Sequence, residues 1–197
     1  AESQIEKALL YKENLAQVRM QTEMELAQKV QLQLLPRQLP TAARLELAAH
    51  SRPAREVGGD FYDATTMPDY SLIFTVGDVT GKGMPAAMVM AMLRTVMRSA
   101  GGQLGSNPQA ILAETNRQLY GDFTDVGMFA TVFTGSYQPN TETLIYANAG
   151  HSPVILCRAG HPAELLVADG TAVGVLPTSL TENQTMRLAA GDVLVIA

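Results

Sequence analysis

Two aspartates that each follow a glycine, Asp60 and Asp78, are the residues whose type and spacing could do chemistry. If the segments that contain them form neighbouring antiparallel strands, both carboxylates can reach one end of a sheet, where small glycines let backbone and ion approach closely. Carboxylate oxygens suit magnesium and manganese. The spacing therefore fits a divalent-cation site, and it also fits two ordinary turns, in which Gly-Asp pairs are common.

The glycines at 77–83, in the run Gly-Asp-Val-Thr-Gly-Lys-Gly, invite comparison with a phosphate-binding loop. A P-loop has four residues between its first glycine and the Gly-Lys pair, which Ser or Thr then follows. Here three residues separate Gly77 from Gly81, and Gly83 stands where the hydroxyl residue should be. The P-loop interpretation fails on both counts, and the simplest role of these glycines is a tight connection into the next helix.

The totals for the chain exclude several classes of protein. It has 197 residues and a formal net charge of -5, so it lacks the broad basic surface that nucleic-acid binding normally needs. Its single cysteine, Cys157, cannot form an internal disulfide, and no apolar run of about 18 residues suggests a membrane span. We expect a soluble, cytoplasmic domain that binds no nucleic acid and makes no membrane contact through this segment.

Residues 1–35 contain no Gly or Pro, and Pro36 follows them, which predicts one long helix. Its apolar stripe is broken, with Lys12 and Glu23 near positions where a strict heptad would place apolar groups. Two interpretations stay open, a weak or regulated coiled coil and a helix packed against its own or an adjoining domain. They differ in oligomeric state.

From residue 36 onward, short apolar runs alternate with Gly, Pro, Asn and Asp, as strands and turns do. Two helices are predicted, Pro85–Ser99 and Pro108–Tyr120, and the methionines of the first are expected to fill core space. Strands, then two helices, then more strands is an α+β order. The predicted strands are 45–51, 57–64, 70–78, 128–137, 143–149, 153–157, 164–168 and 192–197.

Five motifs in order resemble the SpoIIE/RsbU branch of the metal-dependent protein phosphatase (PPM, protein phosphatase 2C-like) superfamily. The resemblance covers nearly the whole chain from about residue 25, and five motifs together are far more specific than any one of them. The motifs are Leu34-Leu35-Pro36, Ser51 to Asp63 (Ser-Arg-Pro-Ala-Arg-Glu-Val-Gly-Gly-Asp-Phe-Tyr-Asp), Gly77 to Gly83, Pro85-Ala86-Ala87 and Asn148-Ala149-Gly150-His151.

The resemblance implies an α-β-β-α sandwich, with two antiparallel sheets flanked by helices and two Mn²⁺ or Mg²⁺ ions at one edge. Asp60 and Asp78 match metal ligands of the family, and the backbone carbonyl of Val79 matches the position of a further ligand. Arg55 lies five residues before Asp60, where related enzymes carry a phosphate-binding arginine, and a guanidinium fork suits that task. An ordinary surface salt bridge is the alternative role for Arg55.

Two features depart from the family pattern. Thr80 stands where eukaryotic relatives place a histidine as a candidate general acid, so the proton donor is unassigned. His151 is a conceivable substitute, although a structural histidine in a turn is the favoured interpretation. The sequence printed here stops at Ala197, before the two aspartates that would supply the downstream metal ligands. We therefore expect a phosphatase domain at 36–197 that is C-terminally incomplete and weakly active or inactive by itself.

The function that the resemblance implies is hydrolysis of a phosphoserine on a regulatory protein, such as a phosphorylated anti-sigma-factor antagonist. The helix at 1–35 would link the domain to an N-terminal sensor or receiver and would pair with a second copy to form a homodimer. The rival hypothesis is a non-catalytic, phosphatase-like adaptor that binds a partner protein. The presence of both Asp60 and Asp78 favours the enzyme.

Overall fold

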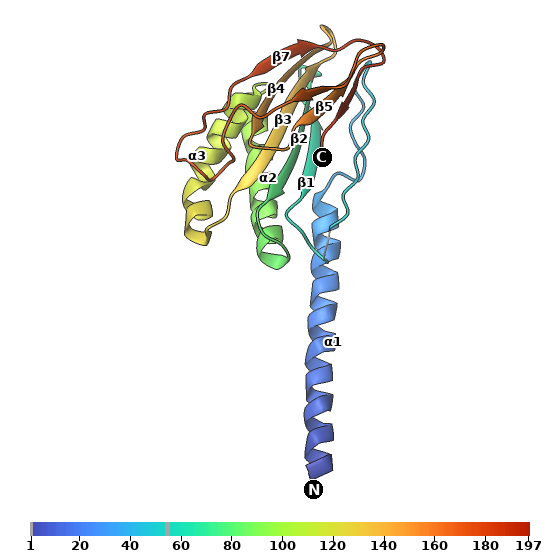
Figure 1. Ribbon diagram of the computed structural model, residues 1–197, viewed down its shortest axis with the longest axis vertical. Helices are drawn as coiled ribbons and strands as arrows, with labels where there is room; N and C mark the ends of the chain where they lie inside the picture. The colour runs from blue at the N-terminus through green and yellow to red at the C-terminus, as the bar shows by residue number, and fades with distance from the viewer. Residues whose placement is uncertain (1, 54–55) are drawn as a thin grey trace.

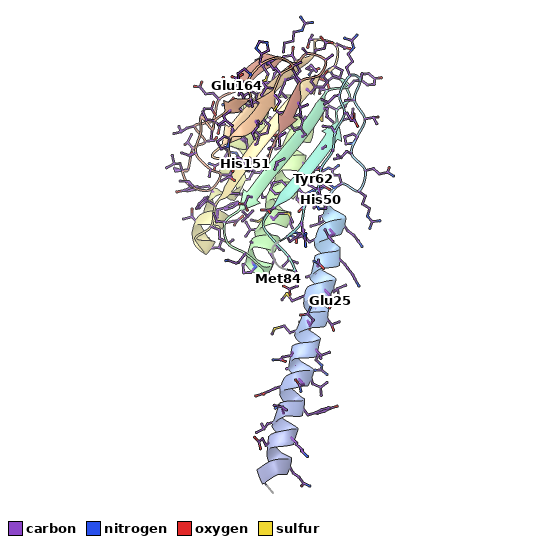
Figure 2. All side chains as sticks on the ribbon, turned by 45° about the vertical axis from the view of Figure 1, so that its right-hand side comes forward. Glu25, His50, Tyr62, Met84, His151 and Glu164 are labelled. Carbon is purple, nitrogen blue, oxygen red and sulfur yellow. The ribbon has the colours of Figure 1, made fainter. Side chains whose placement is uncertain are left out.

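The computed structural model describes residues 2–53 and 56–197. A long helix, α1 (Glu2–Leu34), projects from a layered domain as a nearly isolated rod (Figure 1). The predicted N-terminal helix is confirmed. Most of its described side chains are exposed, and it meets the domain only near its last turns, where Gln31 and Leu35 are buried.

The central layer is a five-stranded antiparallel sheet with the order β1-β2-β3-β4-β7. Alternation explains its two faces, because successive side chains of a strand point to opposite sides. In β3, Val132 packs towards the helices while Phe133 packs towards the second sheet. The strands are β1 (Phe61–Thr66), β2 (Leu72–Val79), β3 (Ala130–Gln138), β4 (Thr143–Ala149) and β7 (Gln184–Arg187).

A smaller antiparallel sheet with the order β6-β5-β8 lies against the second face. Its strands are β5 (Val154–Cys157), β6 (Glu164–Leu166) and β8 (Val193–Val195). The two sheets share an apolar cluster in which Phe133 stacks on Tyr146, with ring centroids 5.4 Å apart. The predicted α+β sandwich of two antiparallel sheets flanked by helices is confirmed.

Two helices cover the other face of the five-stranded sheet, α2 (Met84–Leu104) and α3 (Pro108–Val126). A proline opens each helix at a position where its missing N–H has no intrahelical partner. The side chain of Asn107 caps α3 by accepting a hydrogen bond from the backbone N–H of Ala110. Within the described ranges, none of the helices combines the length and apolar character needed to cross a membrane.

The core role predicted for the methionines holds only in part. Met90 and Met97 are buried in the main cluster, and Met92 packs against it. Met88, however, is 67% exposed. Helix α2 packs against the sheet and α3, so it leaves one side open.

Several elements differ from the prediction: β1 begins at Phe61 instead of residue 57, α3 continues to Val126, and three further differences are larger. Residues 45–51 form no strand: Leu45 and Leu47 alternate into a core cluster, but apart from one isolated bridge at Leu45 the segment has no ladder partner. Strand β7 was missed because it is short and mostly exposed, so no apolar alternation marks it. Helix α2 passes through Gly101 and Gly102 and ends at Leu104, with Gly105 as its C-cap, since buried Gly101 continues the packed face.

Candidate metal centre

Strand pairing brings the two aspartates to the same end of the sheet. Strand β1 runs antiparallel to β2 with Phe61 opposite Gly77, so Asp60, one residue before β1, lies across from Asp78. On the other side of Asp78, Thr131 of β3 is its direct partner. Both carboxylates line one cleft of about 1440 Å³ that runs between the sheets. The spacing in the sequence left open whether the two aspartates meet, and the antiparallel pairing of β1 with β2 brings them together.

Close backbone contact explains the glycine that precedes Asp60. A Cβ on Gly59 would lie 2.4 Å from the carbonyl oxygen of Val79, a distance no side chain could tolerate. The Val79 N–H donates a hydrogen bond to the Gly59 carbonyl at 3.4 Å. The carbonyl of Val79 thus lies beside the Gly59–Asp60 step, and any larger residue at 59 would push the two strands apart.

The environment of Asp78 disfavours its charged form. The pKa of Asp78 is raised from 3.8 to about 6, first by desolvation and then by a hydrogen bond and the negative charge of Asp60. Both side chains still have an open side towards solvent. By contrast Asp63, three residues on, faces the helices and pairs with Arg94 at 3.2 Å and Arg98 at 3.5 Å. In the described part of the chain, no ion pair involves Asp60 or Asp78.

The donor chemistry at Asp60 and Asp78 fits a hard divalent cation. Two carboxylates forced together without a cationic partner are stabilised when a positive ion enters between them. The described residues contain no group of three or more His, Cys, Asp or Glu side chains that could hold an ion together. The protein side chains at this place are therefore limited to the aspartate pair, with the Val79 carbonyl next to it.

His151 lies at the same end of the sheet, in the turn after β4, and lines the same cleft. Its Nδ1 is 3.1 Å from the Thr131 hydroxyl, and its backbone N–H donates to the Asn148 side chain at 2.8 Å. Its Nε2 is buried and has no hydrogen-bond partner among the described atoms. Burial lowers the pKa of His151, although the charge of Asp60 acts in the opposite direction.

The hydroxyl of Thr80 forms hydrogen bonds with the backbone of Phe129. Its Oγ1 donates to the carbonyl of Phe129 at 3.0 Å and accepts from the Phe129 N–H at 3.0 Å. This reciprocal pair ties the end of β2 to the start of β3. Arg55, the predicted phosphate-binding residue, lies outside the described residues.

Gln31 of the long helix forms hydrogen bonds with the loop that precedes Asp60. The amide of Gln31 donates to the Gly58 carbonyl at 2.6 Å and accepts from the Gly58 N–H at 3.1 Å. Gly58 is two residues from Asp60. Sequence reasoning missed Gln31 because a glutamine in a Gln-rich helix carries no distinguishing signal. It also missed Thr131, whose only signal would have been its register opposite Asp78.

Comparison with known proteins agrees with this architecture. The sequence model of the family described as Stage II sporulation protein E (SpoIIE) matches residues 68–197. The chain is 30% identical to Phosphoserine phosphatase RsbU of Bacillus subtilis, with 91% of this chain and 53% of RsbU covered. It is 30% identical to Protein IcfG of Synechocystis, with 88% of this chain and 31% of IcfG covered.

A solved structure, the SiaA-PP2C domain of Pseudomonas aeruginosa, shares the fold with a TM-score of 0.73 at 21% identity. That match covers 91% of this chain and 71% of the SiaA chain. The present chain spans about half or less of the length of RsbU and IcfG. Because the family model matches well over half of the chain, the chain belongs to the SpoIIE family.

Proposed function

We propose that this chain carries a metal-dependent protein-serine/threonine phosphatase domain that hydrolyses a phosphoserine on a regulatory protein. The observation that supports it most is the convergence of Asp60 and Asp78 at one end of the sheet, where the pKa of Asp78 is raised to about 6 by burial and by its acidic neighbour. An uncompensated carboxylate pair is costly unless a cation joins it. RsbU, a relative at 30% identity, is named a phosphoserine phosphatase.

In this mechanism Mn²⁺ or Mg²⁺ would activate a water for in-line attack and offset the charge on the phosphoryl oxygens. Asp60 and Asp78 would bind the ions, and the carbonyl of Val79 would add a neutral oxygen. The rigid β1–β2 pair fixes both carboxylates before substrate arrives, which limits the reorganisation needed during the reaction. Arg55 is proposed to bind the phosphate of the substrate.

The substrate we propose is a phosphorylated anti-sigma-factor antagonist, a small protein with one phosphoserine. A phosphoprotein needs an open site, and the cleft beside Asp60 and Asp78 is open to solvent on one side. The function named for RsbU supports the phosphoserine, while the identity of the protein that carries it rests on family analogy.

The long helix α1 is proposed to pair with a second copy and to connect an N-terminal sensor or receiver to the site. It projects away from the domain and exposes apolar side chains that a partner helix could cover. Its bond from Gln31 to Gly58 supplies a mechanical route to the loop before Asp60. The exposed apolar residues of α1 are Leu9, Leu10, Tyr11, Leu15, Val18, Met20, Leu26, Val30 and Leu32.

Turnover of a phosphoserine protein or peptide by the full-length protein, with added Mn²⁺, tests the enzymatic part. Asp60→Asn and Asp78→Asn should each lower the Mn²⁺-dependent rate by more than about 100-fold, since both carboxylates are proposed ligands. Asp122→Asn, at an exposed position of α3, is the matched control and should leave the rate unchanged. If the folded wild-type chain binds Mn²⁺ no better than a variant that combines Asp60→Asn with Asp78→Asn, the metal site is refuted and a non-catalytic adaptor is favoured.

Sedimentation of the wild-type chain and of Leu9→Glu/Leu15→Glu tests the pairing. A dimer that the double substitution dissociates supports the proposal. Charged groups at these exposed positions cannot disturb the core of the domain, so a wild-type monomer at high concentration argues against pairing through α1.

A further inference from the structure

A row of polar side chains crosses four strands at the metal end of the sheet. Asp60 precedes β1, Asp78 is in β2, Thr131 is its partner in β3, and His151 follows β4. The alternation of side chains places Asp78 and Thr131 on the face that the second sheet covers, the same face as Phe133. The row therefore borders one cleft from end to end.

Two buried polar atoms at this end of the sheet lack a hydrogen-bond partner among the described atoms, His151 Nε2 and Asn148 Nδ2. Buried imidazole nitrogens are normally hydrogen-bonded, and an unpaired one destabilises the fold. The side-chain oxygen of Asn148 accepts a hydrogen bond from the backbone N–H of His151, so Asn148 stabilises this turn. His151 is held in turn by Thr131 at its Nδ1. After these contacts, Nε2 of His151 and Nδ2 of Asn148 remain without a partner among the described atoms, and of the two side chains only that of His151 lines the cleft.

Among the described residues, His151, Asp60 and Asp78 do not form a joint group that could hold a metal ion. His151 is near enough for the charge of Asp60 to act on it. A ring that carries its proton on Nε2 could donate from that atom. The Thr131 hydroxyl, which can donate to Nδ1, is compatible with this tautomer.

We propose that His151 is a positioning residue of this centre: Thr131 holds its ring, and Nε2 donates a hydrogen bond to an oxygen bound at the Asp60–Asp78 pair, without transferring a proton. The inference rests on the proposed metal-dependent function and deepens it. Partners of this kind orient what the ligands bind, and their loss typically costs 10–100-fold in metal affinity or activity. The role differs from that of a general acid, for which a buried neutral imidazole is poorly suited.

The tautomer of the metal-free chain gives the first test. Nitrogen NMR of the histidine-labelled protein should show the proton of His151 on Nε2. The chain has three histidines, and exposed His50 and His161 serve as internal references. A proton on Nδ1 would overturn the proposal, because Thr131 would then accept and Nε2 would have nothing to donate.

Addition of Mg²⁺ alone, and then of Mg²⁺ with inorganic phosphate, identifies the oxygen. A shift of the His151 Nε2 signal with Mg²⁺ alone indicates a bound water, and a shift only after phosphate indicates a phosphoryl oxygen. Either result supports the proposal. If calorimetry shows Mg²⁺ binding while the Nε2 signal stays constant under both conditions, the proposal is wrong.

Two substitutions separate this role from a merely structural one. In His151→Gln the side-chain amide nitrogen can reach the position of Nε2, whereas in His151→Asn it reaches only that of Nδ1. We expect the Gln variant to keep most of the Mg²⁺ affinity and the Asn variant to lose about 10–100-fold. A structural role through Thr131 predicts the reverse order, and equal affinities would also refute the proposal.

Circular dichroism and thermal unfolding without metal confirm that both variants are folded before their affinities are compared. Failure of the wild-type chain to bind Mg²⁺ would contradict the proposed function itself. The tautomer in the metal-free chain would still decide whether Nε2 can donate, so the two failures are distinguishable.

Discussion

The two ends of the five-stranded sheet treat their carboxylates in opposite ways. At one end, Asp60 and Asp78 face each other, and burial and like charge raise the pKa of Asp78. At the other end, in the turn between β3 and β4, Glu142 accepts from Arg44 at 2.6 Å and from Arg187 at 3.1 Å. Hydrogen bonds to these two arginines lower the pKa of Glu142.

This contrast supports the proposal that the Asp60–Asp78 end of the sheet binds a cation. The Glu142 end supplies its own counter-charges and needs no ligand. The Asp60–Asp78 end carries a repulsion that the described part of the chain does not relieve, which is a stability cost expected at sites built to bind a cation. Neutralising an acidic residue at the Asp60–Asp78 end should therefore stabilise the metal-free chain and impair its function. Neutralising Glu142 should slightly destabilise the chain and leave its function unchanged.

Asp78→Asn should give the largest effect, because it should lower the activity while it raises the stability of the metal-free chain. The Mn²⁺-dependent rate should fall by more than about 100-fold. The metal-free chain should become more stable by about 1 kcal/mol at neutral pH, a figure reduced for solvent screening at a partly exposed group. Phosphatase assays and urea unfolding in EDTA measure the two effects, and a destabilised metal-free variant would break the comparison.

Gln31→Ala should follow, with a loss on the order of tenfold in Mn²⁺ affinity or rate. The substitution removes both hydrogen bonds that hold Gly58, so the loop before Asp60 loses its orientation. Gln21→Ala is the matched control, because Gln21 bonds only Glu25 within the exposed part of α1. If both variants behave alike in calorimetry with Mn²⁺, the helix does not position the site through Gln31.

The pH dependence of stability should have opposite signs at the two ends. The folded pKa of Asp78 is raised, so its carboxyl favours the folded metal-free chain at low pH, and this contribution is lost as pH rises from about 4 to about 6. The folded pKa of Glu142 is lowered, so its contribution is present above about pH 4.5 and is lost as pH falls. Denaturant unfolding of wild type, Asp78→Asn and Glu142→Gln at about pH 3, 4.5 and 7 tests both signs.

Glu142→Gln should give the smallest effect. Its partners Arg44 and Arg187 are exposed, and surface ion pairs contribute little. We expect a slight decrease in the denaturation midpoint at pH 7, no change in Mn²⁺ affinity and an unchanged rate. A large loss of activity would show that the two ends of the sheet are coupled.

Much of the fold could be predicted because its elements carry local signals. Helix α1 lacks Gly and Pro, the helices α2 and α3 open with prolines, and β3 and β4 are apolar runs separated by a turn. Strand β7 could not be found, since an exposed strand of four residues depends on its neighbour β4 for its hydrogen bonds. Residues 45–51 were mistaken for a strand because alternate burial needs only one packed face, whereas a strand also needs a ladder partner.

The candidate site divides in the same manner. Asp60 and Asp78 were predictable from their glycines and motifs, and the metal role assigned to them stays a prediction. The bond between Gln31 and Gly58, and the row from Asp78 to His151, could not be predicted, since they join segments far apart in the chain.

The sequence by itself determined the family, the order of the elements and the identity of the two facing acids, because these depend on residue types and local spacing. Only the tertiary structure decided that the two acids share one end of a sheet and form no ion pair with a described basic side chain. It also decided that Asp63 is paired with Arg94, that the Thr80 hydroxyl bonds the backbone and that His151 Nε2 has no partner among the described atoms. The physical reason is that charge compensation and hydrogen-bond satisfaction depend on through-space neighbours, which strand register and helix packing select.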